Sequence, residues 1–172
     1  AAVQVQYALS SERFRLYTSN DPLGVELGGT LKNVIAIAVG VCDGLQLGAN
    51  ARAALVTRGL AEMIRVGSKL GARAETFNGL SGLGDLLATC HSSLSRNYRV
   101  GYGLGQGKPL SQILVEMEGT AEGVYTAPVV VKIAAQHGIP VPITQEVHRL
   151  LQGQTTPTAA LTRLMERQLT SE

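Results

Sequence analysis

One lysine interrupts an otherwise apolar stretch of the chain. Lys32 and Asn33 are the polar exceptions near the start of residues 31–41, a run that is apolar nearly all round and is predicted to form a helix buried on most sides. A lysine in an apolar wall is costly to keep charged, which suits it to proton transfer. The alternative is a lysine at a helix start that extends its ammonium group into water, and periodicity alone favours that alternative.

Asp85 and Thr89 form a second pair of polar side chains. They lie on one face of a predicted helical segment, so they could jointly contact a polar ligand or Lys32. An aspartate in the first turn of a helix also interacts favourably with the helix dipole, and this structural role is at least as common. If Asp85 meets Lys32, the carboxylate favours the ammonium form and desolvation favours the amine, and the sequence leaves that balance open.

A third group consists of Ser95, Arg96 and Asn97, which stand together at a predicted helix start. A guanidinium beside the exposed N–H groups of a helix N-terminus suits a phosphate dianion. A plain helix start with a solvated arginine is an equally good interpretation. The three residues are therefore a candidate phosphate site that needs support from elsewhere.

The glycines do not form a phosphate-binding turn. The spacing of Gly79, Gly82 and Gly84 is G-x-x-G-x-G, the wrong order for a dinucleotide fingerprint, and the Gly101–Gly105 run has Gln106 where a further glycine is required. The sequence also lacks a G-K-S/T phosphate loop. The three histidines and two cysteines have no zinc-ligand spacing. These glycine segments therefore do not supply the turn that binds the phosphates of a dinucleotide.

Helical periodicity dominates from Gly24 onward and predicts an all-α fold. Glycine content makes a helix after Ser95 uncertain, because each glycine costs about 1 kcal/mol relative to alanine. Residue 128 is a proline that should restart or kink its helix. The predicted helices are Asn50 (N-cap) to Leu70 with Gly71 as the stop, Ser81 (N-cap) to Cys90, a segment opening at Thr120 and ending at His137 before Gly138, Thr144 (N-cap) to Gln152, and Thr156 (N-cap) with Pro157 to Gln168.

The first 22 residues carry weaker signals. Phe14, Leu16 and Thr18 alternate as a short strand would, and a turn signal follows at residues 20–22. We therefore expect residues 1–22 to be a connector or strand and residues 23–172 to form one helical domain.

Composition narrows the function classes. The 172 residues are 45% hydrophobic and carry a net charge of +2, which suits one compact core and is too small for a nucleic-acid-binding surface. The longest uninterrupted apolar run is far shorter than the roughly 20 residues of a membrane span. We expect no membrane insertion, no secretory signal and a cytoplasmic protein.

Four motifs in order resemble the C-terminal half of the bacterial-type NAD(P)-dependent glycerol-3-phosphate dehydrogenases. They are G-V-E-L-G-G-T-L-K-N-V-I-A-I-A (24–38), N-A-R-A-A-L-V-T-R-G-L-A-E-M (50–63), G-L-S-G-L-G-D-L-L-A-T-C (79–90) and S-R-N-Y-R (95–99). The resemblance extends from about Phe14 to the C-terminus. Thr30 and Tyr98 depart from the residues that are usual at these positions in the family, alanine and arginine.

The resemblance implies a role for each candidate residue. Lys32 matches the catalytic lysine, which exchanges a proton with the C2 oxygen of the substrate, and this reverses the preference that periodicity gave. Substrate-binding positions match Asn33, Asp85, Thr89, Ser95, Arg96 and Asn97, with Lys32 also touching substrate. Cofactor-contacting positions match Arg96 and Glu122.

The resemblance also implies a fold, a reaction and partners. The fold is a helical bundle like the C-terminal domain of 6-phosphogluconate dehydrogenase. The reaction interconverts sn-glycerol 3-phosphate and dihydroxyacetone phosphate for phospholipid synthesis. NAD or NADP is held mainly by an N-terminal Rossmann domain that these residues lack, so we expect the chain alone to be inactive. We further expect a homodimer.

Two alternatives stay open at this point. The chain could be the helical domain of a related sugar-phosphate or hydroxyacid dehydrogenase, which differs in its use of a phosphate. It could instead be a non-catalytic oligomerisation module, since apolar helices at dehydrogenase C-termini often mediate dimer contacts. The related dehydrogenase is tested by whether Arg96→Ala selectively weakens phosphorylated substrates, and the oligomerisation module by whether glycerol 3-phosphate binds at Arg96 and Asn97.

Overall fold

The computed structural model describes residues 1–166, which form helices and contain no strand. This confirms the all-α prediction. The elements are α1 (Ala2–Leu9), α2 (Pro22–Gly44), α3 (Ala49–Lys69), α4 (Ala74–Phe77), the π-helix η1 (Leu80–Gly84), α5 (Asp85–Cys90), α6 (Arg96–Gly105), α7 (Leu110–Val115), α8 (Gly123–His137), α9 (Pro142–Leu151) and α10 (Pro157–Met165).

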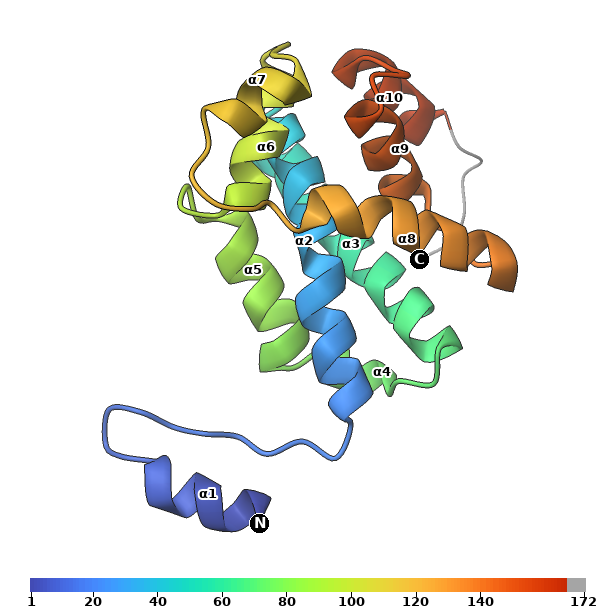
Figure 1. Cartoon of the computed structure of the whole chain (residues 1–172). Coiled ribbons are helices and arrows are strands. Elements are labelled where there is room, and N and C mark those ends of the chain that lie inside the picture. The colour runs from blue at the N-terminus through green and yellow to red at the C-terminus, as the bar shows by residue number, and fades with distance from the viewer. Residues whose placement is uncertain (167–172) are drawn as a thin grey trace.

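Helix α2 is the centre of the bundle, with α3, α5, α6 and α8 packed around it (Figure 1). Its residues Ile35, Ile37 and Val39 are fully buried. By length and composition α2 could also cross a membrane, but 67% of its most apolar window is buried inside the protein. The central position in the core therefore accounts for the apolar composition of this helix.

Glycines explain why α6 forms where its composition argued against a helix. A Cβ atom at Gly101 would collide with the Ile37 carbonyl oxygen, and one at Gly105 would lie 2.6 Å from the Val41 carbonyl oxygen. The two helices therefore touch through their backbones, which only glycine permits at these positions. This packing offsets the low helix propensity of α6 and fixes its position along α2.

Local capping signals predicted several helix ends correctly. The Ser95 hydroxyl accepts a hydrogen bond from the Tyr98 N–H at the start of α6, and Thr156 caps α10 in the same way, with Pro157 in its first turn. Gly138 ends α8 in the left-handed conformation. The predicted end of the last helix at Gln168 lies outside the described residues.

Other predicted boundaries were wrong. Helix α3 begins after Gly48 rather than Asn50, and α8 begins after Glu122 rather than at Thr120. Ser81 caps nothing, because it lies inside η1, which continues without a break into α5. Pro128, which was expected to restart or kink its helix, lies inside α8, so the helix does not restart there.

The predicted strand at residues 14–18 is also wrong. The segment is extended, but an extended segment becomes a strand only beside another strand, and the described part of the chain offers none. The preceding residues form α1, which the sequence did not predict and whose residues are all at least partly exposed. Residues 1–20 extend away from the bundle (Figure 1).

A buried carboxylate explains why Thr144 is not a helix cap. Helix α9 begins earlier, at Pro142, and Thr144 lies in its first turn. Glu62 of α3, which is 2% exposed, accepts hydrogen bonds from the Ile143 N–H (2.9 Å), the Thr144 N–H (2.9 Å) and the Thr144 hydroxyl (2.6 Å). The cap of α9 therefore comes from a residue distant in sequence, which no local pattern reveals.

Glu62 should make stability pH-dependent. Burial raises the pKa of Glu62 above its ordinary value of 4.5, although its hydrogen bonds oppose the shift. The folded state then holds the proton to higher pH than the unfolded state, so this group lowers the free energy of unfolding as pH rises from 4.5 through the folded pKa. Glu62→Gln should reduce that decrease in urea unfolding curves recorded across this range. The exposed Glu118→Gln is the control, and equal slopes in wild type and Glu62→Gln would contradict the prediction.

Candidate active site

Lys32 and Asp85 form an ion pair between α2 and α5. The Lys32 Nζ and an Asp85 carboxylate oxygen are 2.5 Å apart, and the two side chains are 18% and 39% exposed. Lys32 therefore does not extend alone into water, as the alternative from periodicity held. Its ammonium group lies at the edge of the core with one carboxylate partner. A lysine that is held in this way can present a proton at a fixed place.

Thr89 supports the acidic member of this pair. Its hydroxyl donates to the Asp85 carbonyl oxygen at 2.6 Å and lies 3.5 Å from the Asp85 Oδ1. The predicted proximity of Asp85 and Thr89 on one helix face is therefore present. Because the hydroxyl proton is directed to the backbone carbonyl of Asp85, Thr89 does not offer that proton to a ligand in this arrangement.

A second cluster joins α2, α6 and the start of α8. The Asn97 amide donates to the Asn33 Oδ1 at 2.9 Å, and the Asn33 amide donates to a Glu122 carboxylate oxygen at 3.3 Å. The Asn97 Oδ1 accepts from the Gly123 N–H at 2.8 Å. Asn33 and Asn97 are 6% and 7% exposed. Their amides are thus fixed by the protein itself, which favours a supporting role over wide contact with a ligand.

Arg96 is the exposed cation of this region. It is the first residue of α6, directly after the capping Ser95, and its guanidinium lies against Gly119, where a Cβ atom would be 2.5 Å from Nη1. The ion pairs found within residues 1–166 do not include Arg96. Its charge is therefore available to an anion at the start of α6.

The structure thus brings the predicted residues into two adjoining clusters. Lys32, Asp85 and Thr89 form one, and Asn33, Asn97 and Glu122 form the other. Both clusters draw on the same turn of α2, since Lys32 and Asn33 are consecutive there. Ser95 and Arg96 directly precede Asn97 of the second cluster, at the start of α6. The region therefore contains a candidate proton donor, Lys32, and an exposed cation, Arg96.

Sequence reasoning missed the support behind α6. The Tyr98 hydroxyl donates to the Asp43 Oδ2 at 2.7 Å, and Arg52 pairs with the same carboxylate at 2.8 Å. Burial and the bond to Asp43 raise the pKa of Tyr98 to about 12, so the phenol keeps its proton at neutral pH. This contact anchors the first turn of α6 to the end of α2. The position of Tyr98 beside the S-R-N motif was the only signal in the sequence.

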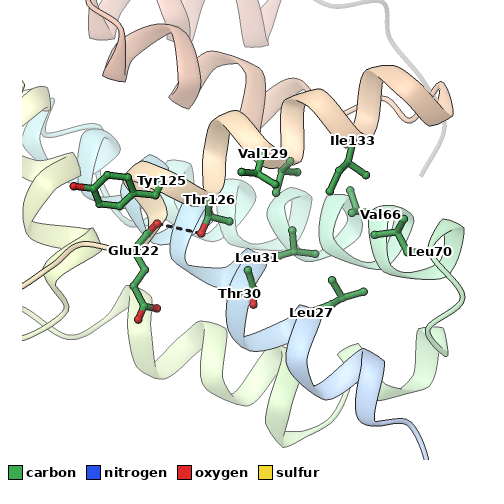
Figure 2. A pocket seen from close by; sticks show the side chains of 11 residues that line it. Leu27, Thr30, Leu31, Val66, Leu70, Glu122, Tyr125, Thr126, Val129 and Ile133 are labelled. Atoms are coloured by element: carbon green, nitrogen blue, oxygen red, sulfur yellow. Dashed lines mark hydrogen bonds between the residues drawn. The ribbon is translucent and has the colours of Figure 1, made fainter.

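An apolar pocket of about 390 Å³ opens between α2, α3 and α8, beside the second cluster (Figure 2). Glu122 lines its edge, and Figure 2 shows the carboxylate of Glu122 pointing away from the apolar side chains. Neither Lys32 nor Asp85 lines the pocket. Its remaining lining consists of Leu27, Thr30, Leu31, Val66, Leu70, Tyr125, Thr126, Val129, Val130 and Ile133.

Comparisons with known proteins identify the family to which the chain belongs. Residues 21–162 match the family model for the NAD-dependent glycerol-3-phosphate dehydrogenase C-terminus. The chain is 95% identical over all its length to a glycerol-3-phosphate dehydrogenase (NAD(P)+) of Synechococcus sp. strain JA-2-3B'a(2-13), of which it covers 55%. It is 65% identical to the enzyme of the same name from Trichormus variabilis and covers 56% of that protein.

A solved structure gives the same result. The glycerol-3-phosphate dehydrogenase of Coxiella burnetii superposes with a TM-score of 0.91 at 45% identity, over 96% of this chain and 51% of that one. The chain therefore spans about half the length of the relatives it matches. On the family match and these identities, the chain belongs to the C-terminal domain family of the NAD-dependent glycerol-3-phosphate dehydrogenases.

Proposed function

We propose that this domain supplies the proton-transfer and phosphate-binding half of an enzyme that interconverts dihydroxyacetone phosphate and sn-glycerol 3-phosphate. The observation that carries the proposal is the Lys32–Asp85 ion pair, which adjoins the amide cluster of Asn33 and Asn97. Membership of the family and the names of the relatives support the same reaction.

Lys32 acts at the C2 oxygen of the substrate. In the reduction, Nζ donates a proton to this oxygen while a hydride arrives at C2, and in the oxidation it takes the proton back. Asp85 accepts from the ammonium group and holds it in place between turnovers, and Thr89 lies beside Asp85 on the same helix face. The NADH or NADPH bound by the complete protein supplies the hydride.

Arg96 binds the substrate phosphate together with the N–H groups at the start of α6. A guanidinium gives two parallel hydrogen bonds to a phosphate, and the helix dipole adds to the attraction. Ser95 and Asn97 flank this corner, and the bond from the Gly123 N–H fixes the orientation of the Asn97 amide.

The chain fits only one edge of a dinucleotide. Its glycines lack the spacing of a phosphate-binding turn, so the body of the cofactor belongs on a Rossmann domain that completes the protein. Glu122 and Arg96 are the residues placed to contact it from this side. One oxygen of Glu122 accepts from Asn33, which orients the carboxylate beside the cluster.

Further features of the complete enzyme belong to the same proposal. We place the boundary between the domains near residue 22, where α2 begins. A cytoplasmic location, a homodimer and a role in phospholipid synthesis are further parts of the proposal, and they are tested by fractionation, by sedimentation and by labelling of lipid glycerol.

The test of the proposed function compares two proteins. The full-length protein that carries this domain should oxidise NADH or NADPH in the presence of dihydroxyacetone phosphate, and the 172-residue chain alone should not, because it lacks the cofactor turn. The decrease in the absorbance of NADH or NADPH measures the activity of both proteins. Turnover by the chain alone, or a full-length protein without this activity, would overturn the proposal. An oligomerisation module would give dimers without turnover.

A further inference from the structure

The residue that lies one helical turn before Lys32 makes an unusual backbone contact. Gly28 of α2 faces η1, where a Cβ atom would collide with the Ser81 carbonyl oxygen and lie 3.3 Å from the Ser81 carbonyl carbon and 3.6 Å from the Gly82 Cα. The obstructing atoms are backbone atoms, which cannot rotate away as a flexible side chain can. The absence of a side chain at Gly28 therefore sets how closely η1 approaches α2.

The Gly28–Ser81 contact precedes the Lys32–Asp85 ion pair by the same number of residues on α2 and on the η1–α5 segment. Lys32 follows Gly28 by four residues on α2, and Asp85 follows Ser81 by four residues through η1 into α5. Helix geometry continues through the junction, since both Gly84 and Asp85 have right-handed helical torsion angles. The spacing of the two backbones at Gly28 is consequently carried one turn onward, to the place where Lys32 and Asp85 meet.

The π-helix has little room to retreat on its buried side. Gly82 packs against the Phe77 backbone, where a Cβ atom would again collide, and the Phe77 ring is fully buried against Gly67 of α3. A displacement imposed at Ser81 therefore cannot be absorbed by moving η1 toward α3. It passes along the chain toward Asp85. Short π-helical turns such as η1 are rare in proteins, and those that occur are frequently found at functional sites.

We propose that Gly28 is a positioning residue for the Lys32–Asp85 ion pair, acting through its backbone contact with η1. This inference rests on the proposed function, because it concerns the proton donor of that reaction. It assigns to the G-L-S-G-L-G-D segment a task other than phosphate binding, namely to hold a carboxylate at a fixed distance from a lysine. Gly28 itself touches no reacting atom.

Gly28→Ala in the full-length enzyme tests the proposal. We expect kcat to fall by about 10²-fold, the effect of a misplacement of about 1 Å, with little change in KM because the phosphate corner lies on α6. A crystal structure should show the ion pair separated beyond 4 Å. Gly29→Ala adds the same methyl group where no atom lies within 4 Å, so it controls for helix propensity and should leave the ion-pair distance unchanged.

A double-mutant cycle with Asp85→Ala separates positioning from general structural damage. If Gly28 acts only through Asp85, the double variant should have the kcat of Asp85→Ala alone. Multiplied losses, or an intact ion pair in Gly28→Ala, would overturn the inference. An Asp85→Ala enzyme with wild-type kcat would remove the proposed role of the ion pair and this inference with it. A low kcat in Asp85→Ala with a normal kcat in Gly28→Ala would overturn the inference alone.

Asp85→Glu gives a test that does not require Gly28→Ala to fold. With the spacing fixed, the longer glutamate side chain cannot be accommodated by a shift of η1, so Asp85→Glu should have a kcat as low as that of Asp85→Ala. If Asp85→Glu recovers activity in the enzyme that keeps Gly28, the backbone of η1 moves freely relative to α2, and the inference is overturned.

Discussion

Replacement of Lys32 by alanine in the full-length enzyme is expected to lower kcat by about 10²- to 10⁴-fold, the usual contribution of a positioned general acid. The KM for dihydroxyacetone phosphate should change little, because the phosphate is bound at the start of α6 and not by Lys32. The physical reason is that, within residues 1–166, Asp85 pairs with no cation other than Lys32, so no described residue replaces the lost proton donor. Steady-state kinetics at saturating cofactor measures both constants.

Lys132→Ala is the matched control for this substitution. Lys132 is an exposed lysine on α8 that takes part in none of the ion pairs found in residues 1–166. Its removal changes the net charge by the same amount and should leave kcat at the wild-type value. A Lys32→Ala enzyme with unchanged kcat would exclude Lys32 from the mechanism.

The second large effect is expected from Arg96→Ala. Loss of a hydrogen bond to a charged group costs about 1.5–3 kcal/mol, which corresponds to an increase in KM for dihydroxyacetone phosphate of about 10- to 150-fold. Turnover of unphosphorylated dihydroxyacetone, which has no phosphate to lose, should be affected much less. The comparison of the two substrates measures the phosphate contact directly.

Arg99→Ala controls for charge on the same helix. Arg99 is exposed and lies one turn further along α6, away from its N-terminus. It should leave KM nearly unchanged. An equal loss for phosphorylated and unphosphorylated substrate in Arg96→Ala would contradict phosphate binding by Arg96, and would favour the related hydroxyacid dehydrogenase as the model for this domain.

Local chemistry made part of the fold predictable. Ser95, Thr156 and Gly138 end or begin helices for reasons contained in a few neighbouring residues, so their patterns could be interpreted without the fold. The apolar character of residues 31–41 similarly predicted a helix in the core, and it lies at the centre of the bundle. Such signals require no knowledge of distant contacts.

Distant contacts decide the features that were missed. The cap of α9 comes from Glu62, α6 is stabilised by glycine contacts with α2, and η1 replaces the predicted N-cap at Ser81. In each case a partner remote in sequence overrides the local preference. A pattern within one segment cannot show which remote residue it will meet.

The candidate site also depends on contacts between residues that are distant in the sequence. Periodicity favoured a solvated Lys32, and only the resemblance to a known family reversed that preference. The ion pair with Asp85 supplies the physical reason, because it links residues from two helices that are far apart in the sequence. The amide cluster was similarly hidden, since the Gly123 N–H that fixes Asn97 has no signature in the sequence.

The most direct measurement is a crystal structure of the full-length protein with glycerol 3-phosphate and the oxidised cofactor. We expect the C2 hydroxyl within hydrogen-bonding distance of the Lys32 Nζ, and the phosphate on the Arg96 guanidinium at the start of α6. A substrate whose C2 oxygen lies away from Lys32, or whose phosphate is bound without Arg96, would contradict this expectation.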